Sequence, residues 1–331
     1  MRKLLCVLLL TALLAVLLTA CGDKSGPTGS LNVYTSMKDS LIMTLVDDFV
    51  AKNPDIIVDI KVAGAGTLMS QIEDERKNGK IIADVLWTSE IPDFYYMKNE
   101  GLLLHYTPAG AENIRNPLNN TDGYFFPARL GTMGIAYNTQ LVSTPPASWH
   151  DLLGPEFANG FAIADPSTSG TALMGVAMLK NAFGTEFFHD LKANGATIGQ
   201  GSSQVIEAVA TGELAACLAV DYITFDKAAT GAPIALAYPP EMIVIPSPVA
   251  IFKDSVNLEN AKKFTDYLIS QDAQKIIAST GTLPILDGVT VPKNYNIPPV
   301  AEAMARIITI DNAGASLLKD GIVDMLLNIM R

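Results

Sequence analysis

The chain repeats one local pattern, in which a short apolar run is followed by a polar turn and then by an amphipathic segment. Residues 31–35 are rich in β-forming side chains, and residues 37–52 carry apolar side chains at the three- and four-residue spacing of a helix. The same order recurs at 56–77 and at 83–100. Because strands that alternate with helices build a sheet covered on both faces, the sequence predicts an α/β fold with a mostly parallel sheet.

A second set of such elements follows later in the chain. A strand is predicted at 160–164, a polar turn at 165–171, and a strand at 215–220 that runs into Asp221 and Tyr222. Polar loops therefore follow the carboxyl ends of several strands. Open α/β sheets bind their ligands at that edge, so the site is expected there. The length of 331 residues favours about two structural units.

The first 20 residues have the character of an export signal. Arg2 and Lys3 precede an apolar run that ends at Leu18-Thr19-Ala20-Cys21. This ending resembles the bacterial lipoprotein lipobox, in which the cysteine is acylated and becomes the new N-terminus. We therefore predict a lipoprotein signal peptide at 1–20 and a lipid anchor on Cys21. An uncleaved membrane helix is the alternative.

The residues after the lipobox predict a tether and then an exported globular chain. Residues 21–30 are rich in Gly and Ser without apolar periodicity, as in a flexible linker. Loss of Arg2 and Lys3 with the signal leaves 21 basic residues against 34 acidic ones, a net charge of −13. An acidic balance disfavours nucleic acid as a partner. We expect a protein lipid-anchored to the cell envelope, on its periplasmic face or at the cell surface.

Several short motifs, in a specific order and spacing, resemble those of the extracellular solute-binding proteins of ABC importers. The branch in question binds ferric iron, 2-aminoethylphosphonate or sugar phosphates. The resemblance runs from Leu31 to about Ile285 and rests on Leu31-Asn32-Val33-Tyr34-Thr35-Ser36, Ala83-Asp84-Val85-Leu86-Trp87, Gly101-Leu102-Leu103, Trp149-His150-Asp151-Leu152-Leu153, Asp165-Pro166, Ser169-Gly170-Thr171, Gly212-Glu213-Leu214, Gly231-Ala232-Pro233, Ala261-Lys262-Lys263-Phe264, Leu268-Ile269-Ser270 and Gln274.

This resemblance implies the type II periplasmic-binding-protein fold, in which two lobes close over a ligand. Each lobe is a mixed sheet flanked by helices, and the chain crosses between the lobes twice. We place lobe one at 31–130 plus 252–331, lobe two at 137–242, and the hinge crossings at 131–136 and 243–251. The resemblance also implies two partners, an ABC permease in the membrane and its ATPase subunit, and we expect the protein to be a monomer.

Loops rich in Gly, Ser and Thr at helix starts are the candidate anion site. Such loops offer unpaired backbone N–H groups, hydroxyls and the positive end of a helix dipole, so an anion fits them without Lys or Arg. The alternative for each hydroxyl is that it caps its own helix. The residues predicted to contact the ligand are Ser36, Gly66, Thr67, Trp87, Ser89, Thr168, Ser169, Gly170, Thr171, Asp221, Tyr222 and Glu241.

Three of these residues are assigned to the rest of the ligand. Asp221 would recognise the amine of an aminoalkylphosphonate or the hydroxyls of a sugar phosphate, with Glu241 assisting. Trp87 would stack on the ligand, or else lie in the core. The predicted ligand is a small organophosphonate or organophosphate, with 2-aminoethylphosphonate as the leading example.

Ferric iron is the alternative ligand. Iron-binding relatives use two adjacent tyrosines, which here are replaced by Asp221-Tyr222, and Met37-Lys38 stand where a histidine would be expected. One phenolate and one carboxylate form a thin ligand set for Fe(III), so no metal and no cofactor is predicted. A partner of a membrane sensor remains a further alternative. Catalysis is disfavoured, since the three His lie apart and no nucleophile motif occurs.

The lipobox generates a direct test. We expect Cys21→Ala to move the protein from the membrane to the soluble fraction, because the acyl chains would be its only anchor. Fractionation followed by immunoblotting measures this. Cys6→Ala, inside the apolar run, is the control and should leave the protein at the membrane. Membrane retention of the Cys21→Ala protein would contradict the lipobox assignment.

Overall fold

The computed structural model describes residues 29–115, 118, 122–309 and 312–331. The predicted signal peptide, Cys21 and the tether up to residue 28 lie outside these residues. Gly29 and Ser30, which the sequence places in the tether, are the first residues of strand β1. No helix within the described part of the chain is both long enough and apolar enough to span a membrane.

Within the described residues the strands form one nine-stranded mixed sheet in the order β2-β1-β3-β9-β4-β7-β5-β6, with β8 paired to β4. Strands β1, β2 and β3 are parallel, as are β5, β6 and β7, and antiparallel β9 and β4 join the two groups. The strands are β1 (Gly29–Thr35), β2 (Ile56–Val62), β3 (Val85–Trp87), β4 (Phe126–Asn138), β5 (Phe161–Ala164), β6 (Thr197–Gly199), β7 (Ala216–Val220), β8 (Ile234–Ala237) and β9 (Ile243–Ile251).

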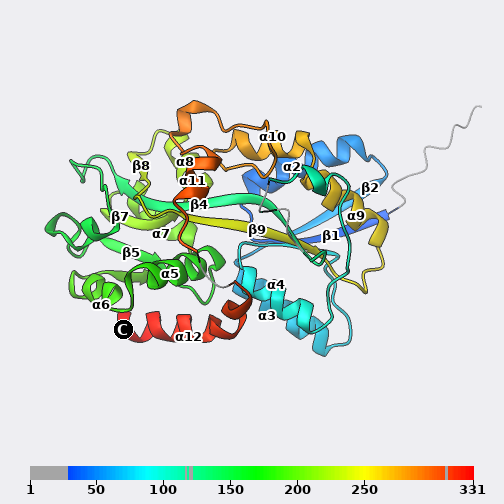
Figure 1. The fold of residues 1–331 in the computed structure, drawn as a ribbon, viewed down its shortest axis with the longest axis horizontal. Helices are drawn as coiled ribbons and strands as arrows, with labels where there is room; N and C mark the ends of the chain where they lie inside the picture. Colours follow the sequence, from blue (N-terminus) through cyan, green and yellow to red (C-terminus); the bar gives the residue numbers. More distant parts are fainter. Residues whose placement is uncertain (1–28, 116–117, 119–121, 310–311) are drawn as a thin grey trace, which may run out of the picture.

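Helices cover both groups of strands, as the alternating pattern predicts (Figure 1). They are α2 (Asp39–Lys52), α3 (Ala65–Lys77), α4 (Ile91–Asn99), α5 (Gly170–Phe183), α6 (Glu186–Ala193), α7 (Ser202–Ala210), α8 (Asp221–Ala229), α9 (Leu258–Leu268), α10 (Gln271–Ser279), α11 (Val300–Ala305) and α12 (Asn312–Met330). Short 3-10 turns occur at Ala111–Asn113, Trp149–Leu153, Pro155–Phe157 and Lys293–Tyr295. The predicted α/β class and the five predicted strands, which correspond to β1, β2, β3, β5 and β7, are confirmed. The prediction of a mostly parallel sheet is wrong, because β4 and β9 pair antiparallel with all their neighbours.

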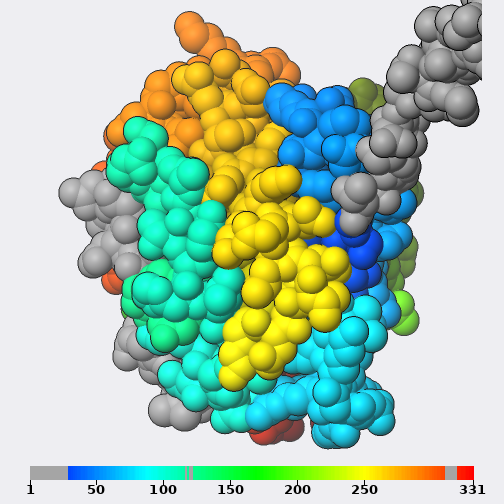
Figure 2. Space-filling view, turned by 90° about the vertical axis from the view of Figure 1, so that its right-hand side faces the viewer, coloured from blue at the N-terminus to red at the C-terminus, as the bar shows by residue number. Residues whose placement is uncertain are grey.

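Strands β4 and β9 run through the middle of the molecule and connect its two sides (Figure 1). One side holds β1–β3 with α2, α3, α4, α9 and α10, and the other holds β5–β7 with α5–α8. Each side has its own apolar core, around Leu45 and Phe264 on the first and around Ile163 and Phe188 on the second. Figure 2 shows that the chain after β9 returns to the first side, where its yellow and orange atoms lie beside the blue N-terminal segment. Both segments predicted as crossings fall within β4 and β9.

The last helix contacts both sides. Helix α12 packs against α4 of the first side and against α5 and α6 of the second. Its residues Ile322, Leu326 and Met330 are buried in the apolar core of the second side. The sequence assigned the whole C-terminal segment to lobe one, and that boundary stays a prediction, but α12 is shared between the two sides.

A buried charge cluster fixes α12 to the start of α4. Lys319 Nζ lies 2.5 Å from Glu90 Oε1 and 2.8 Å from Asp93 Oδ1. Glu90 and Asp93 are 1% and 5% exposed, so two carboxylates share one lysine away from water. Burial, reinforced by the charge of Asp93, raises the pKa of Glu90 from 4.5 to about 8. Glu90 therefore keeps its proton to a higher pH than a carboxyl group in water does.

This cluster predicts a pH dependence of stability. A carboxyl whose pKa is raised by folding favours the folded state at low pH, and the advantage is lost as the pH rises from about 4.5 to about 8. We expect the melting temperature of the wild type to fall relative to that of Glu90→Gln between pH 5 and pH 8.5, measured by circular dichroism. The control Glu112→Gln, at an exposed position, should follow the wild type at every pH. Parallel curves for wild type and Glu90→Gln would contradict the assignment.

Candidate ligand-binding site

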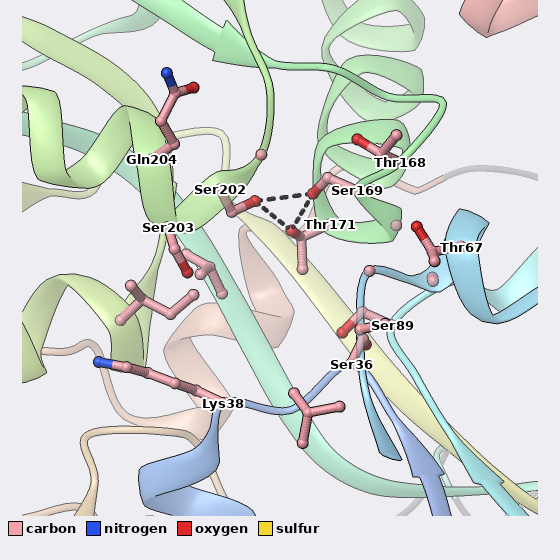
Figure 3. A pocket seen from close by; sticks show the side chains of 18 of the residues that line it. Ser36, Lys38, Thr67, Ser89, Thr168, Ser169, Thr171, Ser202, Ser203 and Gln204 are labelled. Carbon is pink, nitrogen blue, oxygen red and sulfur yellow. Dashed lines mark hydrogen bonds between the residues drawn. The ribbon is translucent and has the colours of Figure 1, made fainter.

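A cavity of about 640 Å³ lies between the two sides of the molecule (Figure 3). Residues that follow β1, β2, β3, β5 and β6, together with the last residue of β7, line it. These are the carboxyl ends of the parallel strands, where the sequence predicts the site. The cavity therefore draws its walls from both parallel groups of strands.

Five helices begin at this cavity. Residues at the starts of α2, α3, α5, α7 and α8 contribute to the lining. The first N–H groups of a helix have no partner within the helix, and α2, α3, α7 and α8 have no side-chain hydrogen bond at their caps. The dipoles of these helices add positive potential at the same place. The wall of the cavity thus offers N–H donors that favour an anion.

Three hydroxyls from two helix starts form a cluster in the wall. Ser169 Oγ lies 2.8 Å from Ser202 Oγ and 3.2 Å from Thr171 Oγ1, and Thr171 Oγ1 lies 3.1 Å from Ser202 Oγ (Figure 3). Ser169 also caps α5 by accepting from the N–H of Ala172 at 3.3 Å. Ser169 therefore both caps α5 and takes part in the hydroxyl cluster. Each hydroxyl retains donor and acceptor capacity for a ligand.

The first side contributes hydroxyls opposite this cluster. Ser36 follows β1, Thr67 lies in the first turn of α3, and Ser89 follows β3. Ser89 is 2% exposed, and its Oγ lies 3.2 Å from Ser247 Oγ. Eight of the twelve predicted ligand residues thus line one cavity: Ser36, Thr67, Ser89, Thr168, Ser169, Gly170, Thr171 and Tyr222.

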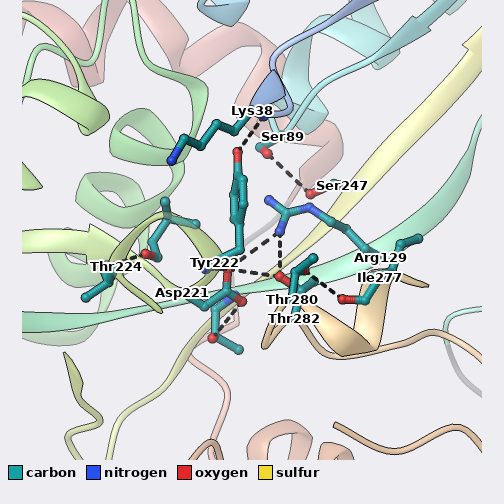
Figure 4. A network of polar contacts seen from close by, with 12 residues as sticks. Lys38, Ser89, Arg129, Asp221, Tyr222, Thr224, Ser247, Ile277, Thr280 and Thr282 are labelled. Carbon is teal, nitrogen blue, oxygen red and sulfur yellow. Dashed lines mark hydrogen bonds and ion pairs between the residues drawn. The ribbon is translucent and has the colours of Figure 1, made fainter. Parts of the chain in front are cut away.

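Tyr222 connects the cavity to a buried cation. Its hydroxyl accepts the backbone N–H of Lys38 at 3.1 Å, and the guanidinium carbon of Arg129 lies 4.5 Å from its ring centre (Figure 4). Burial raises the pKa of Tyr222, so the phenol stays neutral at physiological pH. Lys38 Nζ forms an ion pair with Asp226. The cationic side chain in the lining is thus already paired.

Asp221 does not line the cavity. It is fully buried beneath it, where it accepts hydrogen bonds from the Thr132 N–H at 2.7 Å and the Thr132 hydroxyl at 3.0 Å. Its Oδ1 lies 3.5 Å from an Arg129 nitrogen (Figure 4). Burial raises the pKa of Asp221, against the lowering effects of Arg129 and of the N–H donors. The carboxylate expected to face the ligand instead pairs with a buried arginine.

The other three predicted residues also lie away from the cavity lining. Trp87 is fully buried in the core of the first side, which was the alternative given for it. Gly66 packs against the backbone of Ser167. Glu241 accepts the indole N–H of Trp149 through its main-chain oxygen, at 2.9 Å. None of these three residues is in the lining.

The loop before α7 is part of the site but was not predicted from the sequence. Gln200, Gly201, Ser202, Ser203 and Gln204 all line the cavity, as do Lys38 and Asp39 at the start of α2. A polar, Gly-containing loop before a helix was a usable signal at 200–204. The preceding strand β6 has only three residues and gives too short a pattern to place the loop at the sheet edge.

The described residues contain no group of three or more His, Cys, Asp or Glu side chains that could hold a metal ion. His105 packs edge-on against Tyr124, and His150 against Phe183. Cys217 is buried, and burial raises the pKa of its thiol. The chemistry around the cavity is that of neutral hydrogen-bond donors.

Residues 31–283 match the family model described as bacterial extracellular solute-binding protein. The chain belongs to this family. Its members bind small ligands and deliver them to the permease of an ABC importer, and they are binding proteins rather than enzymes. The resemblance found from the sequence motifs is confirmed.

The chain is similar to binding proteins whose names mention different ligands. A protein of Salmonella paratyphi A named a putative 2-aminoethylphosphonate-binding periplasmic protein is 25% identical over 73% of this chain and 74% of its own length. Iron uptake protein A1 of Synechocystis sp. is 27% identical over 91% of this chain and 90% of its own. The structure of the periplasmic binding protein AfuA from Actinobacillus pleuropneumoniae, with fructose-6-phosphate bound, superposes with a TM-score of 0.77. It is 22% identical and covers 92% of this chain and 99% of that one. The predicted periplasmic-binding-protein fold is confirmed.

The position of Asp221 predicts a structural role. Asp221→Ala leaves Arg129 buried without its partner, and breaking a buried pair in this way costs about 3–5 kcal/mol. We expect that loss in the free energy of unfolding, measured with urea. Glu241→Ala is the control and should change it by less than about 0.5 kcal/mol. A double replacement, Arg129→Met with Asp221→Leu, should recover part of the loss. Wild-type stability of Asp221→Ala would contradict this role.

Proposed function

We propose that this solute-binding protein captures a small organophosphonate or organophosphate by closure of its two lobes and delivers it to an ABC permease. The convergence of helix starts and hydroxyls on one cavity supports this proposal most directly. A phosphoryl or phosphonyl group carries several anionic oxygens, and each oxygen can accept from backbone N–H groups and from hydroxyls such as those of Ser169, Thr171 and Ser202.

The charge distribution also supports an anion. The net charge of the mature chain is −13, yet the lining contains a single carboxylate, Asp39, and a single cation, Lys38. An anionic ligand therefore meets little repulsion in the cavity. The names of two relatives, one for 2-aminoethylphosphonate and one structure with fructose-6-phosphate, agree with a phosphorus-containing head group.

We retain 2-aminoethylphosphonate as the leading example, with one change in the proposed contacts. Since Asp221 lies beneath the cavity, we assign its proposed partnership with the ligand's amine to Asp39, the carboxylate in the lining. A sugar phosphate would use the same donors for its head and the amides of Gln200 and Gln204 for its hydroxyls.

Ferric iron is the second candidate, favoured by the similarity to iron uptake protein A1 over 91% of this chain. Tyr222 is the phenol in the lining, and it would act with the carboxylate of Asp39. Fe(III) prefers several anionic oxygen ligands, so this pair alone is a weak site. The proposal also includes a lipid anchor on Cys21, a monomeric state and an ABC permease with its ATPase subunit as partners.

A ligand screen tests the proposal. The chain from residue 22 onward is mixed with 2-aminoethylphosphonate, fructose 6-phosphate, inorganic phosphate or ferric citrate, and its melting temperature is measured. A ligand at 100 times its Kd adds about 2.7 kcal/mol to the stability of the folded state, which gives a clear shift. We expect a shift with a phosphonate or phosphate ester and recovery of the compound intact.

Matched variants identify the site. The double variant Ser169→Ala, Thr171→Ala should lose the shift, because it removes two of the three clustered hydroxyls. The control double variant Ser279→Ala, Thr280→Ala, at the end of α10 and outside the lining, should keep it. A large shift with ferric citrate alone, abolished by Tyr222→Phe, would overturn the phosphonate proposal in favour of iron.

A further inference from the structure

Two glycines at the start of α3 have no local reason to be glycine. Gly64 has φ −59° and ψ 148°, and Gly66 is not among the residues with positive φ, so alanine could adopt both conformations. Gly66 lies inside the first turn, where glycine is less favourable to a helix than alanine. The local conformation of the first side therefore does not explain why these two positions are glycine.

The reason lies on the opposite side of the cavity. A Cβ atom added to Gly64 would overlap the main-chain oxygen of Thr168, and one added to Gly66 would overlap that of Ser167. The Gly66 position is also 3.1 Å from the carbonyl carbon of Ser167 and 3.3 Å from the Cα of Thr168. These neighbours are backbone atoms of the loop between β5 and α5, so they cannot rotate away as a side chain would.

A third glycine completes this contact from the second side. A Cβ on Gly170, at the start of α5, would lie 2.9 Å from the Cβ of Glu90 and 3.1 Å from the Cβ of Ala65. The starts of α3 and α5 thus approach each other across the cavity through Gly64, Ala65, Gly66 and Gly170. We call these four residues the glycine seam.

Independent contacts join the two sides at another part of the cavity wall. The hydroxyl of Tyr222 accepts the backbone N–H of Lys38 at 3.1 Å, and Lys38 Nζ pairs with Asp226. Lys38 belongs to the first side, and Tyr222 and Asp226 belong to α8 on the second. The two sides are therefore in contact around the cavity, as expected for a closed arrangement.

We propose that Gly64 and Gly66 are positioning residues for ligand capture, which are glycine so that α3 can meet the loop at 167–168 when the lobes close. The proposal rests on the lobe closure given under the proposed function. The potential of a helix terminus acts mainly within its first turn. A methyl group in the seam holds α3 away from the hydroxyl cluster, so one anion no longer reaches the donors of both sides.

The affinity experiment compares alanine at three glycines. Gly64→Ala and Gly66→Ala enter the seam, whereas the control Gly321→Ala, at an exposed position of α12 outside the cavity lining, has no atom within 4 Å of its added Cβ. The probes are 2-aminoethylphosphonate and fructose 6-phosphate, with Kd measured by calorimetry. We expect Gly64→Ala and Gly66→Ala each to raise Kd at least about 10-fold, equivalent to about 1.4 kcal/mol, and Gly321→Ala to change it little.

A second experiment needs no ligand. The variant Lys38→Cys, Asp226→Cys places one cysteine on each side of the cavity. A short bis-maleimide can link these two cysteines only when the sides approach each other, so the rate of cross-linking measures that approach. The chain from residue 22 onward is used, so that Cys217 is its one native cysteine, and this residue is buried and does not compete for the reagent. We expect Gly66→Ala to slow the reaction at least about 10-fold, while Gly321→Ala leaves the rate unchanged.

Each outcome has a defined meaning. The melting temperature of ligand-free Gly66→Ala should equal or exceed that of the wild type, which separates blocked closure from misfolding. Equal cross-linking rates for Gly66→Ala and Gly321→Ala, or equal probe affinities for these two variants, would overturn the role of the seam. If neither probe binds the wild type, the proposed ligand class is wrong, and the cross-linking result still decides the role of the glycines.

Discussion

The antiparallel pairing of β4 with β9 is the constraint on which the rest of the architecture depends. The pairing runs from Phe126 opposite Val249 to Met133 opposite Ile243, and it is irregular between Pro127 and Arg129. Pro246 and Pro248 in β9 have no N–H to donate, so the ladder is weakened in the middle of the sheet. Central strands rarely contain proline. Here the weakened ladder joins two separately packed cores, which gives a physical basis for bending between them.

A network of buried charged and hydroxyl side chains lies next to β4. Arg129 lies in β4, Asp221 starts α8 on the second side, and Thr282 follows α10 on the first. Thr282 accepts from Arg129 at 3.1 Å and lies 3.3 Å from Asp221 Oδ1. Since isolated buried charges are costly, this network favours one relative placement of the two sides at the base of the cavity. The ring of Tyr222 stacks on Arg129, so the same network also positions Tyr222 in the wall of the cavity.

Local sequence patterns were sufficient for five of the nine strands in the described residues and for eight residues of the cavity lining, because strand ends and helix starts are local features. Asp221 shows where they were insufficient. Its position at the end of a strand predicted a carboxylate facing the ligand, but its partner Arg129 is 92 residues earlier, in strand β4, which is not among the predicted strands. The seam glycines show the same limit. Their contacts with Ser167 and Thr168 span about 100 residues and exist only between the two sides, so no local pattern signals them.

Under the proposed function, an acidic protein would favour an anion without a cluster of basic side chains. The donors of the cavity are backbone N–H groups and hydroxyls, held in place by helices from two different sides. A lysine or arginine would attract anions to one side at any lobe separation. Helix termini act over a short range, so strong binding requires α3, α5 and α7 to converge. Affinity that depends on convergence is high when the lobes are together and falls when they part, which suits a protein that must both capture its solute and give it up.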